Sequence, residues 1–229
     1  MISTVYEPPP YQLMHGVPWE TYEFFLEALE GRHLRLTYDE GDLEIMTLTH
    51  EHENWGTLLG RFIETLTLEL DIDIHSGGST TLRRVLKEKG LEADECYWIQ
   101  NERVMRGKKK FKIERDPPPD LAIEVDITRS SLNRMGIYAA LRVPEIWVFN
   151  GKTLRVFLLG TNGKYKESST SLAFPWLPIA EVERFLKENE TMSETALLRA
   201  FSKWVGDTIL PQVEAGKAKK NGNGKKSRK

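Results

Sequence analysis

Residues 118–128 have the sequence PPDLAIEVDIT, and no other segment indicates more about the architecture of the chain. Its centre, Leu121-Ala122-Ile123-Glu124-Val125, is a short apolar run behind a proline cluster, which is the pattern of a buried strand. Glu124 interrupts this run. Because a desolvated carboxylate is unstable as an anion without a cation or hydrogen-bond donors, the segment predicts a buried strand whose glutamate has such a partner.

Helices and strands alternate after this strand. Residues 131–141 predict a helix, with Ser131 as its cap. Asn150-Gly151 is a strong turn signal between two strand-like runs, 145–149 and 153–159, and predicts a hairpin. A second pair, Asn162-Gly163, predicts a turn into an edge strand. Two further helices are expected at about 179–187 and 193–205.

The segments before this strand complete the pattern. Pro18 opens a helix that Gly31 ends. Residues 33–46 contain two alternating runs around a polar turn with a glycine and predict a hairpin, and residues 51–70 predict a long amphipathic helix. Short strands are expected at 72–75, 80–86 and 95–99, and a lysine-rich loop at 101–116. This order predicts the α/β class, with a mixed sheet flanked by helices.

Length and composition exclude several classes of protein. The chain has 229 residues, 40% of them hydrophobic and 29% charged, which suits one ordinary globular domain. No apolar run reaches the roughly 18–20 residues of a membrane span, and residues 1–10 lack the pattern of a secretory signal. The only cysteine, Cys96, excludes an intrachain disulfide and a cysteine-rich zinc site. These features predict a cytoplasmic protein.

The charge is unevenly distributed. From Glu214 onward there are seven basic residues and one acidic residue, a balance of +6, so the rest of the chain carries -8 of the total of -2. We therefore expect a loose N-terminal segment at 1–12, one folded domain at 13–210 and a disordered basic tail at 211–229. Such a tail attracts nucleic acid or serves only for solubility.

Two acidic residues are candidates for chemistry. Asp94 precedes the apolar run 96–99, and Glu124 lies inside the run 121–125. If the two strands are neighbours, these carboxylates converge, and hard oxygen ligands of this kind suit Mg²⁺ or Mn²⁺. Each residue also has a purely structural interpretation, in which Asp94 only starts a strand and Glu124 is only salt-bridged. The spacing of the two residues in the sequence does not distinguish these interpretations from a metal site.

Three segments in register resemble one known family. They are GLEADECYWI at 90–99, PPDLAIEVDIT at 118–128 and IYAALRVPEIW at 137–147. Together they are similar to the Uma-type family of restriction endonucleases, within the PD-(D/E)XK nuclease superfamily. The resemblance spans about residues 19–159.

The resemblance implies a restriction-endonuclease-like core with an added N-terminal helix and hairpin. This core would contain the long helix 51–70, a three-stranded meander near Thr80, Cys96 and Ile123, the helix 131–141 and the strand 145–149. Periodicity alone gave the same order of elements.

The resemblance also assigns roles to residues. Asp94 and Glu124 would be the signature acids and metal ligands, and the early superfamily carboxylate would be Glu53, Glu51 or Glu44, with Glu53 taken as the catalytic candidate. The lysine expected two residues after Glu124 is replaced by Asp126. As an i+2 partner, Asp126 shares a face with Glu124 and is a candidate third metal ligand.

The basic group of the family would come from the following helix. In this sequence it is Arg134, which is either a phosphate clamp or only the cover of a helix face. Ala93 stands where the family usually has proline, which costs some rigidity.

The leading hypothesis is therefore a Mg²⁺- or Mn²⁺-dependent endonuclease that acts on DNA, with a homodimer as the assembly that the superfamily implies. The alternative is an inactive nucleic-acid-binding or regulatory module. A zinc protease built on His50 and His52 is excluded, because no third ligand follows at zinc spacing.

Overall fold

The computed structural model describes residues 11–125 and 130–216, which form two sheets and six α-helices. The predicted α/β class is confirmed. The strands fall into two sheets, however, where one mixed sheet was predicted, because two hairpins far apart in the sequence pair with each other.

The first sheet has the strand order β1-β3-β2-β6-β5 and is antiparallel throughout. Its strands are β1 (Tyr11–Met14), β2 (Leu34–Asp39), β3 (Asp42–Thr47), β5 (Thr81–Arg84) and β6 (Lys89–Glu92). Helix α1 (Trp19–Ala28) covers this sheet, and Trp19, Tyr22 and Tyr38 form an aromatic cluster between them. The hairpin predicted at 33–46 is confirmed and is integral to the fold, since β6 pairs with its β2 strand.

The second sheet has the order β11-β10-β9-β8-β7-β4. Its strands are β4 (His75–Ser76), β7 (Glu95–Trp98), β8 (Leu121–Val125), β9 (Glu145–Phe149), β10 (Leu154–Leu159) and β11 (Tyr165–Ser168). Only β8 and β9 are parallel, and α4 (Arg134–Leu141) provides the crossover that a parallel pair requires. The strand predicted at 121–125 is confirmed, and all five of its residues are buried.

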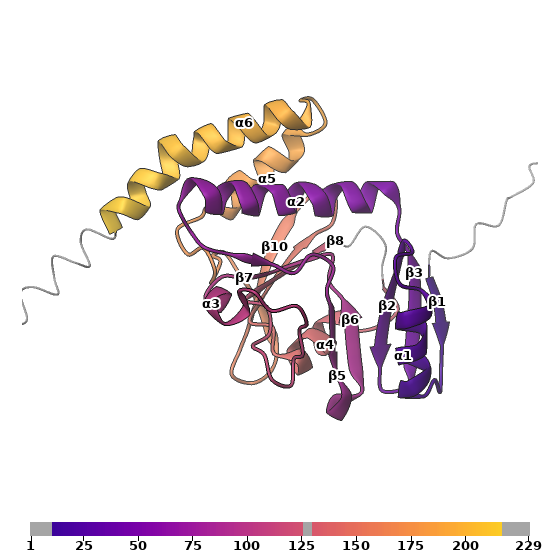
Figure 1. Ribbon diagram of the computed structural model, residues 1–229. Coiled ribbons are helices and arrows are strands. Elements are labelled where there is room, and N and C mark those ends of the chain that lie inside the picture. The colour runs from indigo at the N-terminus through magenta and orange to yellow at the C-terminus, as the bar shows by residue number, and fades with distance from the viewer. Residues whose placement is uncertain (1–10, 126–129, 217–229) are drawn as a thin grey trace, which may run out of the picture.

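Helices cover both faces of the second sheet. On one face lies α2 (His50–Glu69), whose apolar side packs on Tyr97, Ile123 and Val125. Helix α6 (Glu194–Trp204) lies outside α2, above it in Figure 1, while α5 (Ile179–Glu188) packs on β10 of the sheet. The opposite face packs on α4 through Ala122 and Ile146. Strand β8 is thus enclosed on both sides, which explains its continuous apolar sequence.

The predicted meander near Thr80, Cys96 and Ile123 is wrong in one strand. Residues 80–86 do not form a single strand beside β7. They form β5 and the 3-10 turn Val85–Lys87, after which the chain returns as β6 of the first sheet. On the side of β7 away from β8, the neighbouring strand is instead the short β4. The polar loop expected at 101–116 is largely irregular and contains one short helix, α3 (Glu102–Met105).

The predicted ends of the domain fall partly outside the described residues. Tyr11 and Gln12, expected in the loose segment, belong to β1, and residues 211–216, expected in the disordered tail, are helical. The basic tail from 217 onward and Asp126 lie outside the described residues. Within the described part of the chain, no helix has the combined length and hydropathy needed to cross a bilayer.

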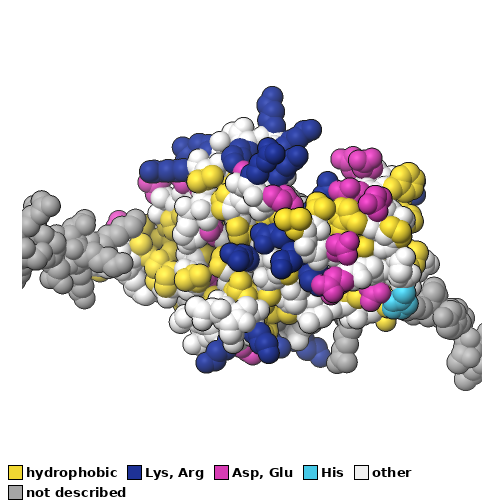
Figure 2. Space-filling view, turned by 90° about the horizontal axis from the view of Figure 1, so that it is seen from below, with side chains coloured by type: hydrophobic (Ala, Val, Ile, Leu, Met, Phe, Trp, Pro, Cys, Tyr) yellow, Lys and Arg dark blue, Asp and Glu magenta, His cyan; other side chains and the backbone are white. Residues whose placement is uncertain are grey.

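Charge is also segregated in space. In Figure 2, acidic side chains gather at the right, over the side of the molecule where Figure 1 places α1 and the hairpin β2–β3. Lysine and arginine side chains lie at the upper edge and in the middle of the same face. On this face, acidic side chains therefore gather over the N-terminal sheet, apart from most of the basic ones.

Candidate functional site

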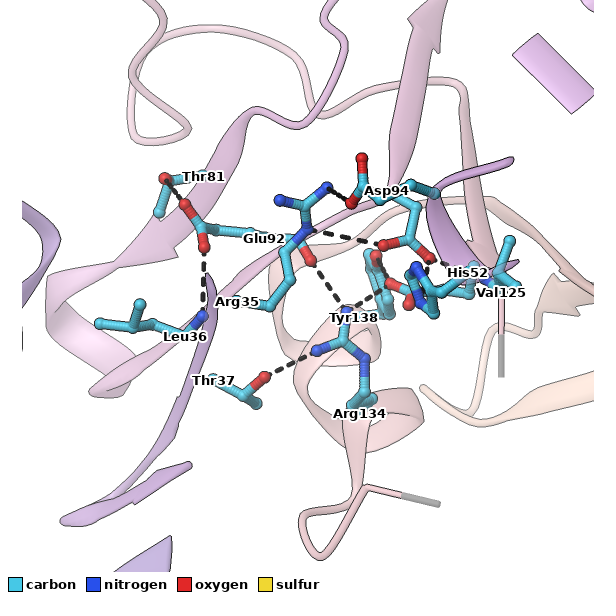
Figure 3. Close-up of polar contacts among 12 residues, drawn as sticks. Arg35, Leu36, Thr37, His52, Thr81, Glu92, Asp94, Val125, Arg134 and Tyr138 are labelled. Carbon is cyan, nitrogen blue, oxygen red and sulfur yellow. Dashed lines mark hydrogen bonds and ion pairs between the residues drawn. The ribbon is translucent and has the colours of Figure 1, made fainter. Parts of the chain in front are cut away.

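A cavity of about 510 Å³ opens where the two sheets meet, and residues of both sheets, α2 and α4 line it. Three of the predicted site residues, Asp94, Glu124 and Arg134, are among the lining residues. Figure 3 shows Arg35 from β2, His52 from α2, and Arg134 and Tyr138 from α4 directed toward the region of Asp94. Segments distant in the sequence thus converge on one site, as the resemblance implied.

Asp94 lies in the connection between β6 and β7, and only 8% of its surface is exposed. Its Oδ2 accepts a hydrogen bond from the backbone N–H of Val125 at 2.7 Å, which ties the connection to the end of β8. Burial and the neighbouring Glu124 carboxylate raise the pKa of Asp94 to about 8. The side chain therefore lacks enough positive charge around it to hold it as a stable anion.

Glu124 lies inside β8, is 9% exposed and turns toward α4. Its Oε1 accepts a hydrogen bond from Arg134 Nη2 at 2.6 Å and another from the Tyr138 hydroxyl. Burial raises the pKa of Tyr138 well above its usual value, and Glu124 adds to this effect. The partner predicted for the buried glutamate is therefore an arginine–tyrosine pair one helical turn apart.

Arg134 is held at three points. Besides Glu124, its guanidinium donates to Thr37 Oγ1 at 2.6 Å and to the carbonyl of Glu92 at 2.9 Å. Burial lowers the pKa of Arg134, but Glu124, Tyr138 and Asp94 together outweigh burial and raise it. Because Thr37 and Glu92 belong to the first sheet, this one side chain connects α4, the first sheet and β8.

Arg35 and His52 flank Asp94 on its other side. Arg35 Nε lies 3.5 Å from Asp94 Oδ1, and His52 Nε2 lies 3.3 Å from Asp94 Oδ2. Burial lowers the pKa of His52, although Glu124 opposes this effect, so His52 is neutral at pH 7. Arg35 is thus the cation nearest to Asp94 among the contacts of the described residues.

The three candidates for the early carboxylate have different surroundings. Glu53 does not line the main cavity. It lies 3.8 Å from Arg35 and lines a smaller adjoining cavity of about 30 Å³ together with Asp94. Glu44 is fully buried and accepts hydrogen bonds from the segment before α4: from the hydroxyls of Ser130 and Ser131 and from the Ser131 backbone N–H. Glu51 is exposed in the first turn of α2.

Asp94 and Glu124 have the chemistry of ligands for a divalent cation. Two buried carboxylates share the cavity, and the raised pKa of Asp94 shows that further positive charge would stabilise its anion. Within residues 11–125 and 130–216, no group of three His, Cys, Asp or Glu side chains is arranged to hold a metal by itself. The pair therefore fits an ion such as Mg²⁺, which keeps several waters and uses one or two carboxylates.

Sequence reasoning did not assign roles to several residues of the site. Tyr138 has a position on the apolar face of its helix, which predicts only a core residue; it is indeed buried, but its hydroxyl contacts Glu124. Its spacing of four from Arg134 could have revealed this. Arg35 gave no signal, because an arginine in a hairpin strand is ordinary and its proximity to Asp94 depends on the pairing of β2 with β6, the strand just before Asp94. Ser131 is not the cap of α4; Asn133 is, accepting from the Gly136 N–H at 3.0 Å, while Ser131 binds Glu44.

Comparison with known proteins agrees with this geometry. The family model Uma2, described as "Putative restriction endonuclease", matches residues 19–207, which is most of the chain. A search of curated proteins found no match. The matched range includes all the strands of both sheets except β1, and every residue described above at the cavity. Proteins of the restriction-endonuclease-like type generally use divalent metal ions. The chain therefore belongs to the Uma2 family of putative restriction endonucleases, a nuclease family whose substrate is nucleic acid.

Proposed function

We propose that the protein is an endonuclease that uses Mg²⁺ or Mn²⁺ to hydrolyse phosphodiester bonds in DNA. One observation carries the proposal: Asp94 and Glu124 come from separate strands, are each less than one-tenth exposed, and line the same cavity. Two carboxylates brought so close out of water are electrostatically unfavourable unless a cation joins them. A structural role alone gives no reason to retain both.

Asp94 and Glu124 would hold the ion. Both side-chain contacts of Glu124 described above are made to Oε1, so Oε2 is the oxygen assigned to the metal. Asp126 is proposed as a third ligand on the strand spacing given above. When bound, the ion stabilises the negative charge that develops on the phosphate during hydrolysis. Arg134 and Tyr138 fix the orientation of Glu124, and we assign them this positioning role.

Arg35 is proposed to bind the phosphate. It lines the cavity beside Asp94, and its side chain is 15% exposed, so the guanidinium faces the space in which a phosphate would lie. Glu53, at 3.8 Å from Arg35, would hold this guanidinium in place, which gives the predicted early carboxylate an indirect role. The positive charge of Arg35 also offsets the repulsion between the acidic N-terminal sheet and a bound phosphate.

One observation favours the alternative, an inactive nucleic-acid-binding module. Arg134 already neutralises Glu124 through a 2.6 Å ion pair, and the lysine of the superfamily motif is absent. A module of this kind would bind nucleic acid through its arginines and would need no metal. The homodimer and the cytoplasmic location also stay predictions.

The two functions differ in a cleavage assay. Purified protein is incubated with supercoiled plasmid and with single-stranded DNA in Mg²⁺, Mn²⁺ or EDTA, beside Asp94→Asn and Glu124→Gln. The endonuclease predicts metal-dependent cutting that falls at least about a thousandfold in both variants. Binding of DNA without cutting, unchanged by either variant, would establish the alternative. Cutting that persists in EDTA would contradict the metal requirement.

A further inference from the structure

The cavity has a second end that the hydrolytic residues do not use. Beyond Glu124 its wall is apolar, formed by Leu132 and Met135 around the start of α4 and by Val148 and Phe157 on the sheet. All four are partly exposed. The guanidinium of Arg155 lies over the Phe157 ring, 4.8 Å from its centroid. An aromatic ring, an arginine and aliphatic side chains thus lie in the same cavity as the two carboxylates.

Strand register fixes the position of this wall relative to Glu124. Glu124 pairs with Val148 across β8 and β9, and Val148 pairs with Arg155 across β9 and β10. The three side chains therefore form one row on the α4 face of the sheet, and Arg155 lies two strand spacings, about 10 Å, from Glu124. Phe157, two residues after Arg155, lies on the same face. A nucleotide with its phosphate at Glu124 can therefore extend its base toward Phe157.

The burial of the carboxylates restricts how a strand can reach them. Asp94 and Glu124 are 8% and 9% exposed, and the cavity of about 510 Å³ is in the size range of pockets for small molecules. A continuous duplex keeps its bases stacked inside and does not fit into such a space. A nucleotide that leaves the stack does fit, because its base, sugar and phosphate enter together.

The charged residues of the cavity also suit an unstacked nucleotide. Three arginines, Arg35, Arg134 and Arg155, line the cavity with the two carboxylates and a neutral histidine. Arg155 forms an ion pair with Glu167 at 2.6 Å, and both partners are about half exposed. Glu167 accepts two hydrogen bonds from Arg155, from Nε at 3.1 Å and from Nη2 at 2.6 Å, so the planar face of the guanidinium is the part available to a base.

We infer that Phe157 and Arg155 form a nucleobase-binding subsite, so that the enzyme acts on nucleotides that are unpaired: single strands, frayed ends or flipped bases. This inference rests on the proposed function for the phosphate end of the cavity. The base stacks on the Phe157–Arg155 pair, against Val148, while its phosphate lies at Asp94 and Glu124. Base–aromatic stacking tolerates any sequence, so this subsite selects unpaired structure and not a particular base.

Two measurements test the inference. The first compares binding of a short single-stranded oligonucleotide with that of a fully abasic oligonucleotide of equal length and charge, by fluorescence anisotropy in EDTA and in Ca²⁺. The second compares cleavage of the same strand alone and annealed to its complement, in Mn²⁺. We expect the normal strand to bind about tenfold more tightly than the abasic strand. We expect the single strand to be cut at least about tenfold faster than the duplex.

Variants of Phe157 isolate the subsite. Phe157→Ala should abolish the preference for bases over abasic sugar, whereas Phe157→Tyr, which keeps the ring, should retain it. The control is Phe24→Ala, because Phe24 is a 64% exposed phenylalanine of α1 and does not line the cavity. Melting temperatures of all variants verify that each is folded.

The outcomes separate the subsite from the proposed function. Base-dependent binding that Phe157→Ala removes, without any cutting, supports the subsite and rejects the nuclease. Equal binding of normal and abasic strands, or no binding of either, overturns the subsite. Equal cutting of single strand and duplex overturns the selectivity for unpaired nucleotides while the nuclease stands.

Discussion

Asp94 links the electrostatics of the site to the stability of the fold. Its pKa of about 8 in the folded protein lies well above the reference value of 3.8. Between these values the folded state binds a proton that the unfolded state has lost. The free energy of unfolding therefore decreases as the pH rises through this window. The acid that we assign to the metal is thus a source of instability in the metal-free protein.

Asp94→Asn should remove this pH-dependent loss of stability, because asparagine does not ionise. In EDTA at pH 8.5 we expect the variant to be at least about 1 kcal/mol more stable than the wild type, a rise in Tm of roughly 2–4 °C, and to be equal to it near pH 4. Thermal unfolding at both pH values measures this. Glu95, whose pKa burial and Glu64 raise to about 7, contributes to both proteins, so their difference isolates Asp94. Equal stability at pH 8.5 would contradict the electrostatic account.

The Arg134–Glu124 ion pair should be strongly coupled because both side chains are largely buried. Arg134→Met leaves a buried carboxylate unpaired and should cost about 3–5 kcal/mol in chemical denaturation, while the double variant with Glu124→Gln recovers part of that loss. The control is Arg61→Met, since the Arg61–Glu194 pair is about half exposed and should contribute about 1 kcal/mol or less. A similar loss in the two arginine variants would refute the assigned role of Arg134.

The regular elements of this chain could largely be predicted from the sequence, because their signals are local. Pro18 opens α1, the apolar spacing marks α2, and Gly151, with φ of 83°, makes the predicted turn between β9 and β10. The partition into two sheets could not be predicted in this way. It depends on the pairing of β2 with β6, which lie some fifty residues apart, and pairing of this kind leaves no periodic signal.

The same distinction holds for the candidate site. Asp94, Glu124 and Arg134 were predicted from a resemblance in linear sequence, and all three line the cavity. Arg35 and Thr37 were missed because they reach the site only through the pairing of β2 with β6 and the contact of β2 with Arg134 of α4. Ser131 was wrongly predicted to cap α4, because it donates instead to the buried carboxylate of Glu44 in the first sheet.

Glu44 of β3 anchors the segment before α4 through hydrogen bonds. Its carboxylate accepts three hydrogen bonds from Ser130 and Ser131, so Glu44→Ala should cost about 1.5–3 kcal/mol and increase hydrogen exchange at the start of α4. Glu27→Ala, at an exposed position of α1, should change stability by less than about 0.5 kcal/mol. If hydrogen exchange in α4 stays unchanged, the anchoring role of Glu44 is wrong.

The whole molecule separates its stabilising core from its chemistry. The C-terminal helices pack on the outer side of α2, where the Phe201 and Phe62 rings stack with centroids 4.4 Å apart. The cavity lies on the other side, where residues of both sheets and of α4 line it together with His52 of α2. The core therefore supports α2, and α2 in turn supports the site through His52.

Phe201→Ala should accordingly cost about 3–5 kcal/mol without altering the site. Denaturant unfolding measures the loss, and the Mn²⁺-induced rise in Tm should keep the same size as in the wild type. A variant that loses stability and also the response to Mn²⁺ would show that core and site are not independent.

Metal binding at Asp94 and Glu124 is the claim on which the nuclease depends. Isothermal titration of the metal-free protein with Mn²⁺ measures it most directly, with Asp94→Asn and Glu124→Gln titrated alongside. We predict that the wild type binds Mn²⁺ at this site and that each variant loses at least about tenfold in affinity. No heat of binding in the wild type, or an affinity that neither variant changes, would contradict the claim.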